Sequence, residues 1–276
     1  MIVAIHGLGL MGASMGAALR SRRAVERVIG ICRRPEVARR AVELGAADEA
    51  GTDLGRLGEA DVVVLATPVR VILDTLERAA GHLKRGATLT DVGSTKQAVL
   101  EKVESLQPVP SFVGGHPIAG TEQSGLEACD PNLYVGAPYF LLRSTRTGPV
   151  DMERVVGLVR GIGARPIELP GAQAHDRMIA ETIHLPHLIA YALEECIARE
   201  SRANAGPSFR GATRVAASHP DMVLDFLLTN GPATEGAVER FVTVLKELSA
   251  QVRRGDEVAL RARLQKIRSS VPPTSI

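Results

Sequence analysis

The stretch IVAIHGLGLMG, residues 2–12, decides the fold. Its first four residues are apolar and mostly β-branched, which predicts a strand, and the glycines that follow have the spacing G-x-G-x-x-G at the start of a predicted helix. The first glycine permits the tight turn, the second lets the backbone approach a pyrophosphate, and the third lets helix and strand pack closely. The stretch predicts a dinucleotide site, and a plain glycine turn is the alternative. The residues expected to contact the cofactor are Gly7, Gly9, Leu10, Met11 and Gly12.

Strand-like and amphipathic runs alternate over the first 169 residues. The predicted strands are Ile2–Ile5, Val28–Ile31, Asp61–Ala66, Ala87–Val92, Phe112–Gly115, Tyr139–Leu142 and Pro166–Leu169. The predicted helices are Met11–Arg20, Val37–Leu44, Val71–Leu83, Lys96–Leu106 and Asp151–Ile162. Because strands that alternate with helices form parallel sheets covered on both faces, we expect an α/β domain over residues 1–169, a Rossmann-type doubly wound parallel sheet.

From Gly171 onward the β-branched runs stop and helical patterns dominate. The predicted helices are His175–Ser201, with Pro186 as a candidate kink, Pro220–Thr229, Glu235–Arg253 and Asp256–Ser269. We therefore expect a second, all-α domain over residues 170–276. Its last six residues, VPPTSI, are expected to fray.

The composition excludes several classes of protein. Lys and Arg number 33 and Asp and Glu 31, a net charge of +2 that is too balanced for an electrostatic nucleic-acid binder. Aromatic residues make up 3% of the chain, which leaves little for base stacking. With no secretory signal and no run of 18 apolar residues, we expect neither export nor a membrane span. The three cysteines have neither disulfide nor zinc spacing, which fits a reducing cytoplasm.

The end of the second predicted strand bears on the choice of cofactor. NAD-binding chains usually carry an acidic residue there for the ribose 2′-hydroxyl, but here Cys32 takes that position and Arg33 and Arg34 follow it. Two guanidiniums can bind a 2′-phosphate through charge-assisted hydrogen bonds. We therefore predict NADP, with NAD as the alternative if both arginines are solvated loop charges. Thr67 and Pro68, which follow a later strand, are expected to face the cofactor.

Three polar segments carry the candidate chemistry. DVGSTK, residues 91–96, and GGHPIAGTE, residues 114–122, follow predicted strands at the edge that faces the ligand in open α/β sheets. HLPH, residues 184–187, lies in the long predicted helix. A zinc site made from its two histidines is a rival interpretation, but no third ligand has suitable spacing, so we expect no metal.

Together with GLGLMG at residues 7–12 and TRVAASHP at residues 213–220, these segments resemble the prephenate/arogenate dehydrogenase family of tyrosine biosynthesis. The resemblance covers nearly the whole chain, in the same order and spacing. It implies an NAD(P)-dependent oxidoreductase that converts prephenate to 4-hydroxyphenylpyruvate with loss of CO₂. Arogenate dehydrogenase, which gives tyrosine directly, is the alternative. The resemblance also implies a homodimer built from the C-terminal helices, with the active site between the two domains.

The resemblance assigns roles to five residues. His116 is expected to accept the proton of the substrate's 4-hydroxyl, and Ser94 to orient His116 and the substrate. Arg214 is expected to hold a substrate carboxylate in a bidentate fork, with His187 as a second substrate contact. Glu122 is expected to gate the pocket through an ion pair or to contact the amine of arogenate.

Structural alternatives accompany these roles. His116 can instead be a loop histidine bonded to backbone, Ser94 a helix N-cap, and Arg214 a surface arginine. Lys96 is either a surface charge or a neighbour of the cofactor phosphates. His184 is expected to be a packing residue whose ring is fully hydrogen-bonded.

Three departures from the family pattern leave the choice between prephenate and arogenate open: Ile183, Gly211 and Val223 stand where relatives often carry Ser, Asp and Trp. Two other classes of function are weaker. A 3-hydroxyacid or imine reductase would use a lysine of the helical domain, where only Lys246 and Lys266 occur. A non-catalytic dinucleotide sensor would need the glycine loop but would not explain the polar segments.

Overall fold

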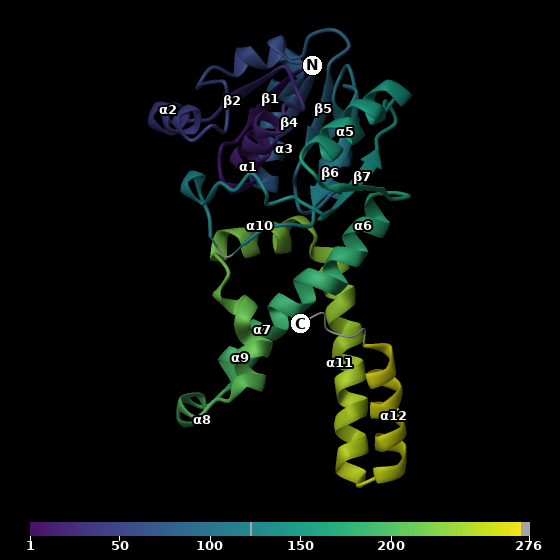
Figure 1. Cartoon of the computed structure of the whole chain (residues 1–276). Coiled ribbons are helices and arrows are strands. Elements are labelled where there is room, and N and C mark those ends of the chain that lie inside the picture. The colour runs from purple at the N-terminus through teal and green to yellow at the C-terminus, as the bar shows by residue number, and fades with distance from the viewer. Residues whose placement is uncertain (122, 272–276) are drawn as a thin grey trace.

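The computed structural model describes residues 1–121 and 123–271 and has two parts (Figure 1). An α/β domain holds the sheet, and below it in Figure 1 lies a helical part with two projecting arms. One arm contains α7 (Leu185–Cys196), α8 (Arg199–Ala203) and α9 (Pro207–Thr213), and the other contains α11 (Gly231–Arg254) and α12 (Glu257–Ser270). No described helix combines the length and apolar character needed to cross a bilayer.

A single sheet of eight strands forms the centre of the α/β domain, in the order β3-β2-β1-β4-β5-β6-β7-β8. The strands are β1 (Ile2–His6), β2 (Arg27–Ile31), β3 (Glu49–Gly51), β4 (Val62–Leu65), β5 (Thr88–Asp91), β6 (Phe112–Pro117), β7 (Pro138–Arg143) and β8 (Arg165–Glu168). The strand order reverses at β1, which lies between β2 and β4. The ligand crevice of such a sheet opens at the carboxyl ends of the strands on either side of this reversal.

Helices cover both faces of the sheet, which confirms the doubly wound prediction. One face carries α1 (Leu10–Ser21), α2 (Pro35–Glu43) and α5 (Pro149–Gly161), and the other carries the 3-10 helix η1 (Leu54–Glu59), α3 (Val69–His82) and α4 (Gln97–Ser105). Because alternate residues of a strand point to opposite faces, Val3 and Ile5 join the first core and Ala4 the second.

The expectation of a wholly parallel sheet is wrong at one ladder. β7 pairs antiparallel with β6, so that His116 lies opposite Phe140, whereas the other ladders are parallel. The described part of the β6–β7 connection contains one short 3-10 helix, η2 (Leu126–Ala128), in place of the long crossover helix that parallel strands need. The edge strand β3 was not predicted, because its three residues, EAG, include no β-branched side chain.

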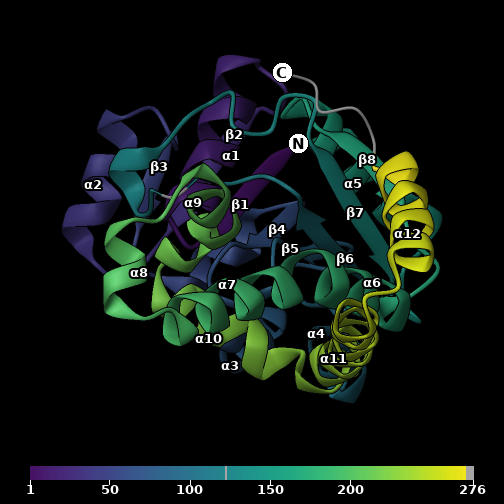
Figure 2. The same ribbon diagram turned by 90° about the horizontal axis from the view of Figure 1, so that it is seen from below.

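The long helix predicted over His175–Ser201 is divided in the structure. α6 (Ala172–Ile179) passes into a π-helical segment, η3 (Ala180–His184), and then into α7, which ends at Cys196. Pro186 lies in the first turn of α7 and has no N–H to donate to the preceding turn, which accounts for the wider π turn before it. Figure 2 shows α6 and α7 crossing beneath the sheet, next to α10 (Pro220–Thr229). Of the segment VPPTSI, all but Val271 lies outside the described residues.

Candidate active site

The glycine loop lies between β1 and α1. Gly7 has a φ of +105°, and a Cβ there would lie 2.5 Å from the carbonyl oxygen of Ala66. A Cβ on Gly12 would lie 1.9 Å from the carbonyl oxygen of Gly7, whereas Gly9 faces open space. No described side chain caps the N-terminus of α1, so its first N–H groups are available to an anion. The loop therefore has close packing at Gly7 and Gly12 and open space at Gly9, as the binding of a dinucleotide pyrophosphate requires.

The neighbouring loop end adds a polar group to this crevice. Leu10 and Met11 form the half-buried first turn of α1. Thr67 follows β4, and its Oγ1 is buried without a hydrogen-bond partner among the described residues. Pro68 is exposed and precedes α3. A buried hydroxyl without a partner costs free energy unless a ligand satisfies it, so Thr67 fits a bound cofactor.

The two arginines after β2 lie on the surface. Arg33 and Arg34 are exposed, and Arg34 lies 3.8 Å from Glu36. Cys32 is buried beside them and donates to the carbonyl oxygen of Arg34 at 3.3 Å. Burial, followed by the positive charges of Arg78 and Arg33, lowers the pKa of His6 at the end of β1. The end of the crevice between β1 and β2 is thus electropositive.

His116 lies within strand β6, not in the loop that the sequence predicted. Its Nδ1 is 2.9 Å from Nε2 of His175, and Nδ1 of His175 is 2.7 Å from Oδ1 of Asp176. All three side chains are buried. Burial, followed by the electrostatic effects of the neighbouring His175 and Lys96, holds the pKa of His116 well below its ordinary value. His116 is therefore neutral near pH 7 and is bonded to the helical domain through α6.

A buried ion pair supports the strand ends around His116. Lys96 and Asp91 are both fully buried, and the ammonium of Lys96 contacts Oδ2 of Asp91. Asp91 also accepts the N–H of Gly93 at 2.9 Å and that of Gly115 at 3.0 Å. Of the two alternatives for Lys96, the surface charge is wrong, because its side chain is fully buried, and its closeness to the cofactor phosphates stays a prediction. The carboxylate partner of Lys96 and the two N–H bonds to Asp91 satisfy the buried charges.

Ser94 does not cap α4. The N-cap position belongs to Lys96, and the carboxylate of Asp176 accepts the N–H groups of Lys96 and Gln97, each at 2.8 Å. The cap comes from α6 of the helical domain, 79 and 80 positions later in the sequence. Ser94 is half-buried and lies two residues before Lys96. Its role in orienting His116 stays a prediction.

The helical domain contributes a second pair of histidines. His184 is buried, its Nδ1 lies 3.0 Å from Oγ1 of Thr234, and its Nε2 has no partner among the described residues. Its ring was expected to be fully hydrogen-bonded, and that expectation is wrong. His187 bonds the carbonyl oxygen of Ile183 through Nδ1 at 2.8 Å, and its Nε2 lies 3.3 Å from Oγ of Ser218.

Arg214 is exposed and opens the 3-10 helix η4 (Arg214–Ala217), which packs against α7. Ser218 follows η4 and bonds His187, so the segment that carries Arg214 lies beside the second histidine pair. The structure thus places the TRVAASHP segment against the HLPH helix. Glu122 lies outside the described residues.

Two phenylalanines pack among the histidines. Phe140 meets the rings of His116 and His175 edge-on, with centroids 6.5 and 6.0 Å apart. Phe226 stacks on His184 at 4.4 Å and meets His187 edge-on at 5.2 Å. Four of the seven histidines therefore gather where the two domains meet. No group of three or more His, Cys, Asp or Glu side chains in the described ranges is placed to hold a metal ion.

His175 and Asp176 are the site residues that sequence reasoning missed. Their signal in the sequence is an adjacent His and Asp at the start of the helical domain. His116 lies 59 positions before His175, and a single sequence does not show that these two histidines are in contact. A second carboxylate, Asp225 on α10, was missed for the same reason. It accepts the N–H groups of Val69 and Arg70 at the start of α3, at 2.6 and 3.1 Å.

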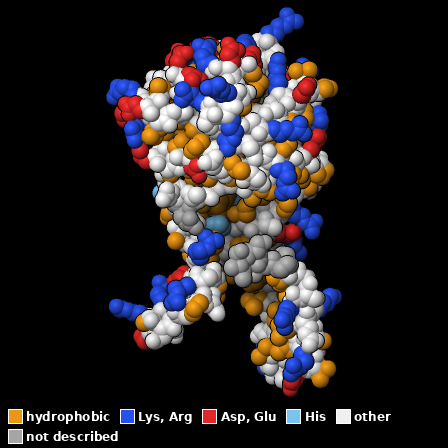
Figure 3. Space-filling view, in the orientation of Figure 1, with side chains coloured by type: hydrophobic (Ala, Val, Ile, Leu, Met, Phe, Trp, Pro, Cys, Tyr) orange, Lys and Arg blue, Asp and Glu red, His pale blue; other side chains and the backbone are white. Residues whose placement is uncertain are grey.

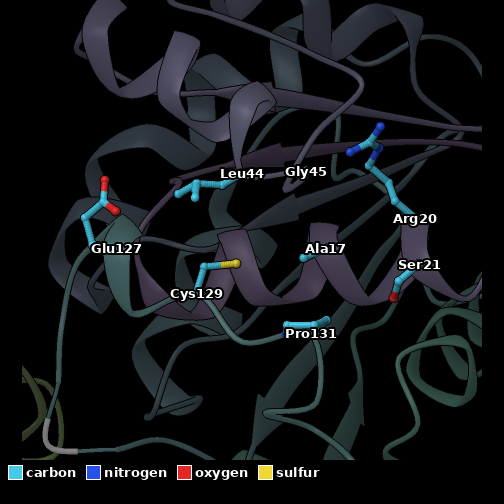
Figure 4. A pocket seen from close by; sticks show the side chains of 8 residues that line it. All are labelled: Ala17, Arg20, Ser21, Leu44, Gly45, Glu127, Cys129 and Pro131. Atoms are coloured by element: carbon cyan, nitrogen blue, oxygen red, sulfur yellow. The ribbon is translucent and has the colours of Figure 1, made fainter.

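Two cavities lie elsewhere on the α/β domain. One of about 430 Å³ lies beside the last turns of α1, between Leu44 and Cys129 (Figure 4). Its charged side chains are already paired, Arg20 with Asp48 and Glu127 with Arg40. Another, of about 680 Å³, lies at the carboxyl ends of α3 and α4. Neither is lined by the glycine loop or the histidines.

Comparisons with known proteins agree with this architecture. A family model described as the nucleotide-binding domain of prephenate dehydrogenase matches residues 15–168. A second, described as the dimerization domain of prephenate dehydrogenase, matches residues 171–266. Together they account for most of the chain.

Individual relatives carry related names. Prephenate dehydrogenase of Bacillus subtilis is 34% identical over 256 residues, which span 89% of this chain and 68% of that protein. Cyclohexadienyl dehydrogenase of Zymomonas mobilis is 33% identical over 259 residues, 91% of this chain and 88% of that protein.

Solved structures of similar proteins superpose over nearly the full length. Prephenate dehydrogenase from A. aeolicus, in complex with hydroxyphenyl propionate and NAD⁺, has a TM-score of 0.89 and 31% identity, covering 97% of this chain and 96% of that one. Synechocystis arogenate dehydrogenase has a TM-score of 0.87 and 30% identity, covering 98% of both chains. By these matches the chain belongs to the prephenate/arogenate dehydrogenase family and is an NAD(P)-dependent oxidoreductase.

Proposed function

We propose that this enzyme oxidises prephenate to 4-hydroxyphenylpyruvate, with His116 as the base. The observation that supports this most is the setting of His116 at the carboxyl end of β6. Its Nδ1 bonds His175, and no described residue bonds its Nε2. A buried, neutral imidazole with one free nitrogen can accept the proton of a substrate hydroxyl.

The bond changes follow from this assignment. The hydroxyl proton passes to Nε2 of His116 as the hydrogen on the same carbon leaves as hydride. Loss of CO₂ then places its bond electrons in the ring, which becomes aromatic, and the new phenolic oxygen takes the proton back. A bound nicotinamide supplies the hydride acceptor. The free N–H groups of α1 and the buried hydroxyl of Thr67 are placed to hold that cofactor.

The same proposal gives roles to the remaining residues. Arg214 holds a substrate carboxylate, and His187 contacts the substrate from the HLPH helix. Ser94, three residues before the start of α4, orients His116 and the substrate hydroxyl. Glu122 gates the pocket. Support comes from the packing of η4 on α7 and from the bond between His187 and Ser218.

A comparison of kcat/KM for prephenate and arogenate, each with NAD⁺ and NADP⁺, tests the substrate. Formation of reduced cofactor is followed by absorbance, and the highest kcat/KM is expected with prephenate and NADP⁺. His116→Asn is expected to lower kcat roughly 100-fold or more, with cofactor affinity unchanged. If no combination turns over, the proposed function is wrong.

Arogenate is the second candidate substrate. Ile183 replaces a serine that the family pattern places before His184, which removes a polar contact to the substrate. The similar proteins include both a cyclohexadienyl dehydrogenase and an arogenate dehydrogenase. A higher kcat/KM with arogenate than with prephenate would favour this candidate.

We propose NADP as the preferred cofactor, bound at its 2′-phosphate by Arg33 and Arg34. Both are exposed beside the electropositive end of the crevice, and Cys32 leaves the usual acidic position without a charge that would repel phosphate. Arg33→Ala should therefore lower kcat/KM with NADP⁺ roughly tenfold and leave that with NAD⁺ unchanged. The matched control is Arg165→Ala, on the opposite edge strand β8. Equal losses with both cofactors would contradict this assignment.

We further propose a homodimer, a domain boundary at residues 169–170 and a cytoplasmic location. The match of residues 171–266 to a dimerization domain supports the first two. Three free cysteines, Cys32, Cys129 and Cys196, fit a reducing compartment.

A further inference from the structure

Three buried side chains from two domains form a line of hydrogen bonds that ends at the proposed base. His116 comes from β6 of the α/β domain, and His175 and Asp176 come from α6 of the helical domain. The distances are 2.9 Å from Nδ1 of His116 to Nε2 of His175 and 2.7 Å from Nδ1 of His175 to Oδ1 of Asp176. His175 is completely buried, so the line has no competition from solvent.

The carboxylate at the end of the line sets the direction of every proton in it. An ionised carboxylate only accepts, so His175 donates from Nδ1 to Asp176. Burial lowers the pKa of His175, so its ring is neutral near pH 7 and its Nε2 carries a lone pair. Nδ1 of His116 must therefore donate, and the proton-free nitrogen of neutral His116 is Nε2.

Asp176 is itself held in place. Besides His175, its carboxylate accepts the backbone N–H groups of Lys96 and Gln97 at the start of α4. The amide of Asn230 donates to its carbonyl oxygen at 2.8 Å. Phe140 packs edge-on against both histidine rings and limits their rotation. These contacts fix the orientation of the line relative to the strand that carries His116.

We propose that His175 is the positioning residue of this enzyme. With Asp176 behind it, His175 holds His116 in the tautomer whose Nε2 is free to accept the substrate proton, and it stabilises the imidazolium that forms. The inference rests on the proposed role of His116 as the base. Because His175 belongs to α6 of the helical domain, the orientation of His116 also depends on the contact between the two domains.

Two variants of His175 test this role in the full-length enzyme. His175→Phe keeps a ring of similar size but removes both nitrogens, and we expect kcat to fall roughly 10- to 100-fold with KM for substrate and cofactor nearly unchanged. His175→Gln keeps an acceptor for Nδ1 of His116 and should recover most of kcat. In His175→Phe the acidic limb of the kcat/KM–pH profile should move to lower pH, because the imidazolium loses its acceptor. The control is His82→Gln, an exposed histidine on α3, with no effect expected.

The tautomers of His116 and His175 can also be measured in the unmodified enzyme, without reference to turnover. Long-range ¹H–¹⁵N NMR of histidine-labelled protein at pH 7.5 should show His116 and His175 protonated at Nδ1 and free at Nε2. His116 protonated at Nε2, or an unchanged kcat in His175→Phe, overturns the proposal. Failure of the wild type to turn over either substrate would instead count against the proposed function, whatever the tautomer.

Discussion

Among single residues, the buried titratable groups show how the site is stabilised. Lys96 is completely buried, and burial lowers the pKa of its ammonium while the Asp91 carboxylate opposes that change. Removing one member of such a pair leaves an unpaired buried charge, at a cost of about 3–5 kcal/mol. Asp91 also bonds the N–H groups of Gly93 and Gly115, so the pair connects the end of β5 to the strand that carries His116.

His184 should make the stability of the protein depend on pH. Burial lowers its pKa to about 4, whereas an unfolded histidine titrates near 6.5. The unfolded state therefore binds more protons between these values, and the stabilisation is complete above pH 6.5 and lost as pH falls towards 4. Between pH 7.5 and 5 this group alone should reduce the free energy of unfolding by about 2 kcal/mol.

The contribution of His184 can be isolated by substitution. His184→Asn keeps a donor near Oγ1 of Thr234 but does not titrate. In urea unfolding at pH 7.5, 6.5 and 5, its free energy of unfolding should fall less than that of the wild type. His82→Asn, at an exposed site, should retain the wild-type slope. Parallel slopes for wild type and His184→Asn would contradict the prediction.

The sequence pointed to candidate residues grouped in local motifs, but it did not show the settings of residues that depend on tertiary packing. The glycine loop, His116 and His187 stand out because each belongs to a motif whose residues lie within a few positions of one another. Lys96 was expected either at the surface, where lysines usually lie, or beside the cofactor phosphates. Its partner, Asp91, is only five positions away, but the burial of the pair depends on the packing of α4 and α6 against the sheet.

At the scale of elements, two carboxylates of the helical domain cap two helices of the α/β domain. Asp176 on α6 caps α4, and Asp225 on α10 caps α3. Neither α3 nor α4 has a side-chain cap of its own at its N-cap residue, Pro68 or Lys96. Because these helices start at the ligand edge of the sheet, the same bonds that join the domains also fix the walls of the crevice.

Asp225→Ala should loosen this junction. The change leaves the N–H groups of Val69 and Arg70 without their acceptor and should lower the free energy of unfolding by about 1–3 kcal/mol. Because α3 follows Thr67 and Pro68, KM for the cofactor should rise as well. Urea unfolding and steady-state kinetics measure the two effects.

Asp221→Ala is the matched control, since Asp221 lies on the same helix, with its side chain 87% exposed. It should change neither quantity. If Asp225→Ala has the same free energy of unfolding and the same KM for the cofactor as the wild type, the junction does not depend on this cap.

Periodicity predicted most elements but not how they pair. The bounds of α1, α3, β4 and α10 agree with the expected ranges to within two residues. The direction of β7 was missed because a run such as YFLL does not encode the direction of its neighbour. The division of the long helix at η3 was anticipated only as a kink at Pro186, because the effect of a proline appears in the turn that precedes it.

At the scale of the whole molecule, the arm made of α11 and α12 does not bury an apolar face of its own. α12 contains no buried residue, and α11, of 24 residues, buries only Thr234 and Ala237. Figure 3 shows hydrophobic side chains, in orange, along the α11–α12 arm. Helices of a stable domain bury one apolar face, so these helices require a partner surface. The match to a dimerization domain supports a second copy of this chain as that partner.

Leu245→Glu should therefore convert the proposed dimer into a monomer. Leu245 is 52% exposed, and Val252 lies two turns along the same face of α11 at 64% exposed. A glutamate in the buried centre of an apolar interface loses its hydration without gaining a partner, which opposes association. Thr243→Glu introduces the same residue on the opposite face of α11 and should leave the dimer intact. Light scattering after gel filtration measures the mass of each variant. If the wild-type enzyme has the mass of one chain, or if Leu245→Glu is still a dimer, this arm is not the interface.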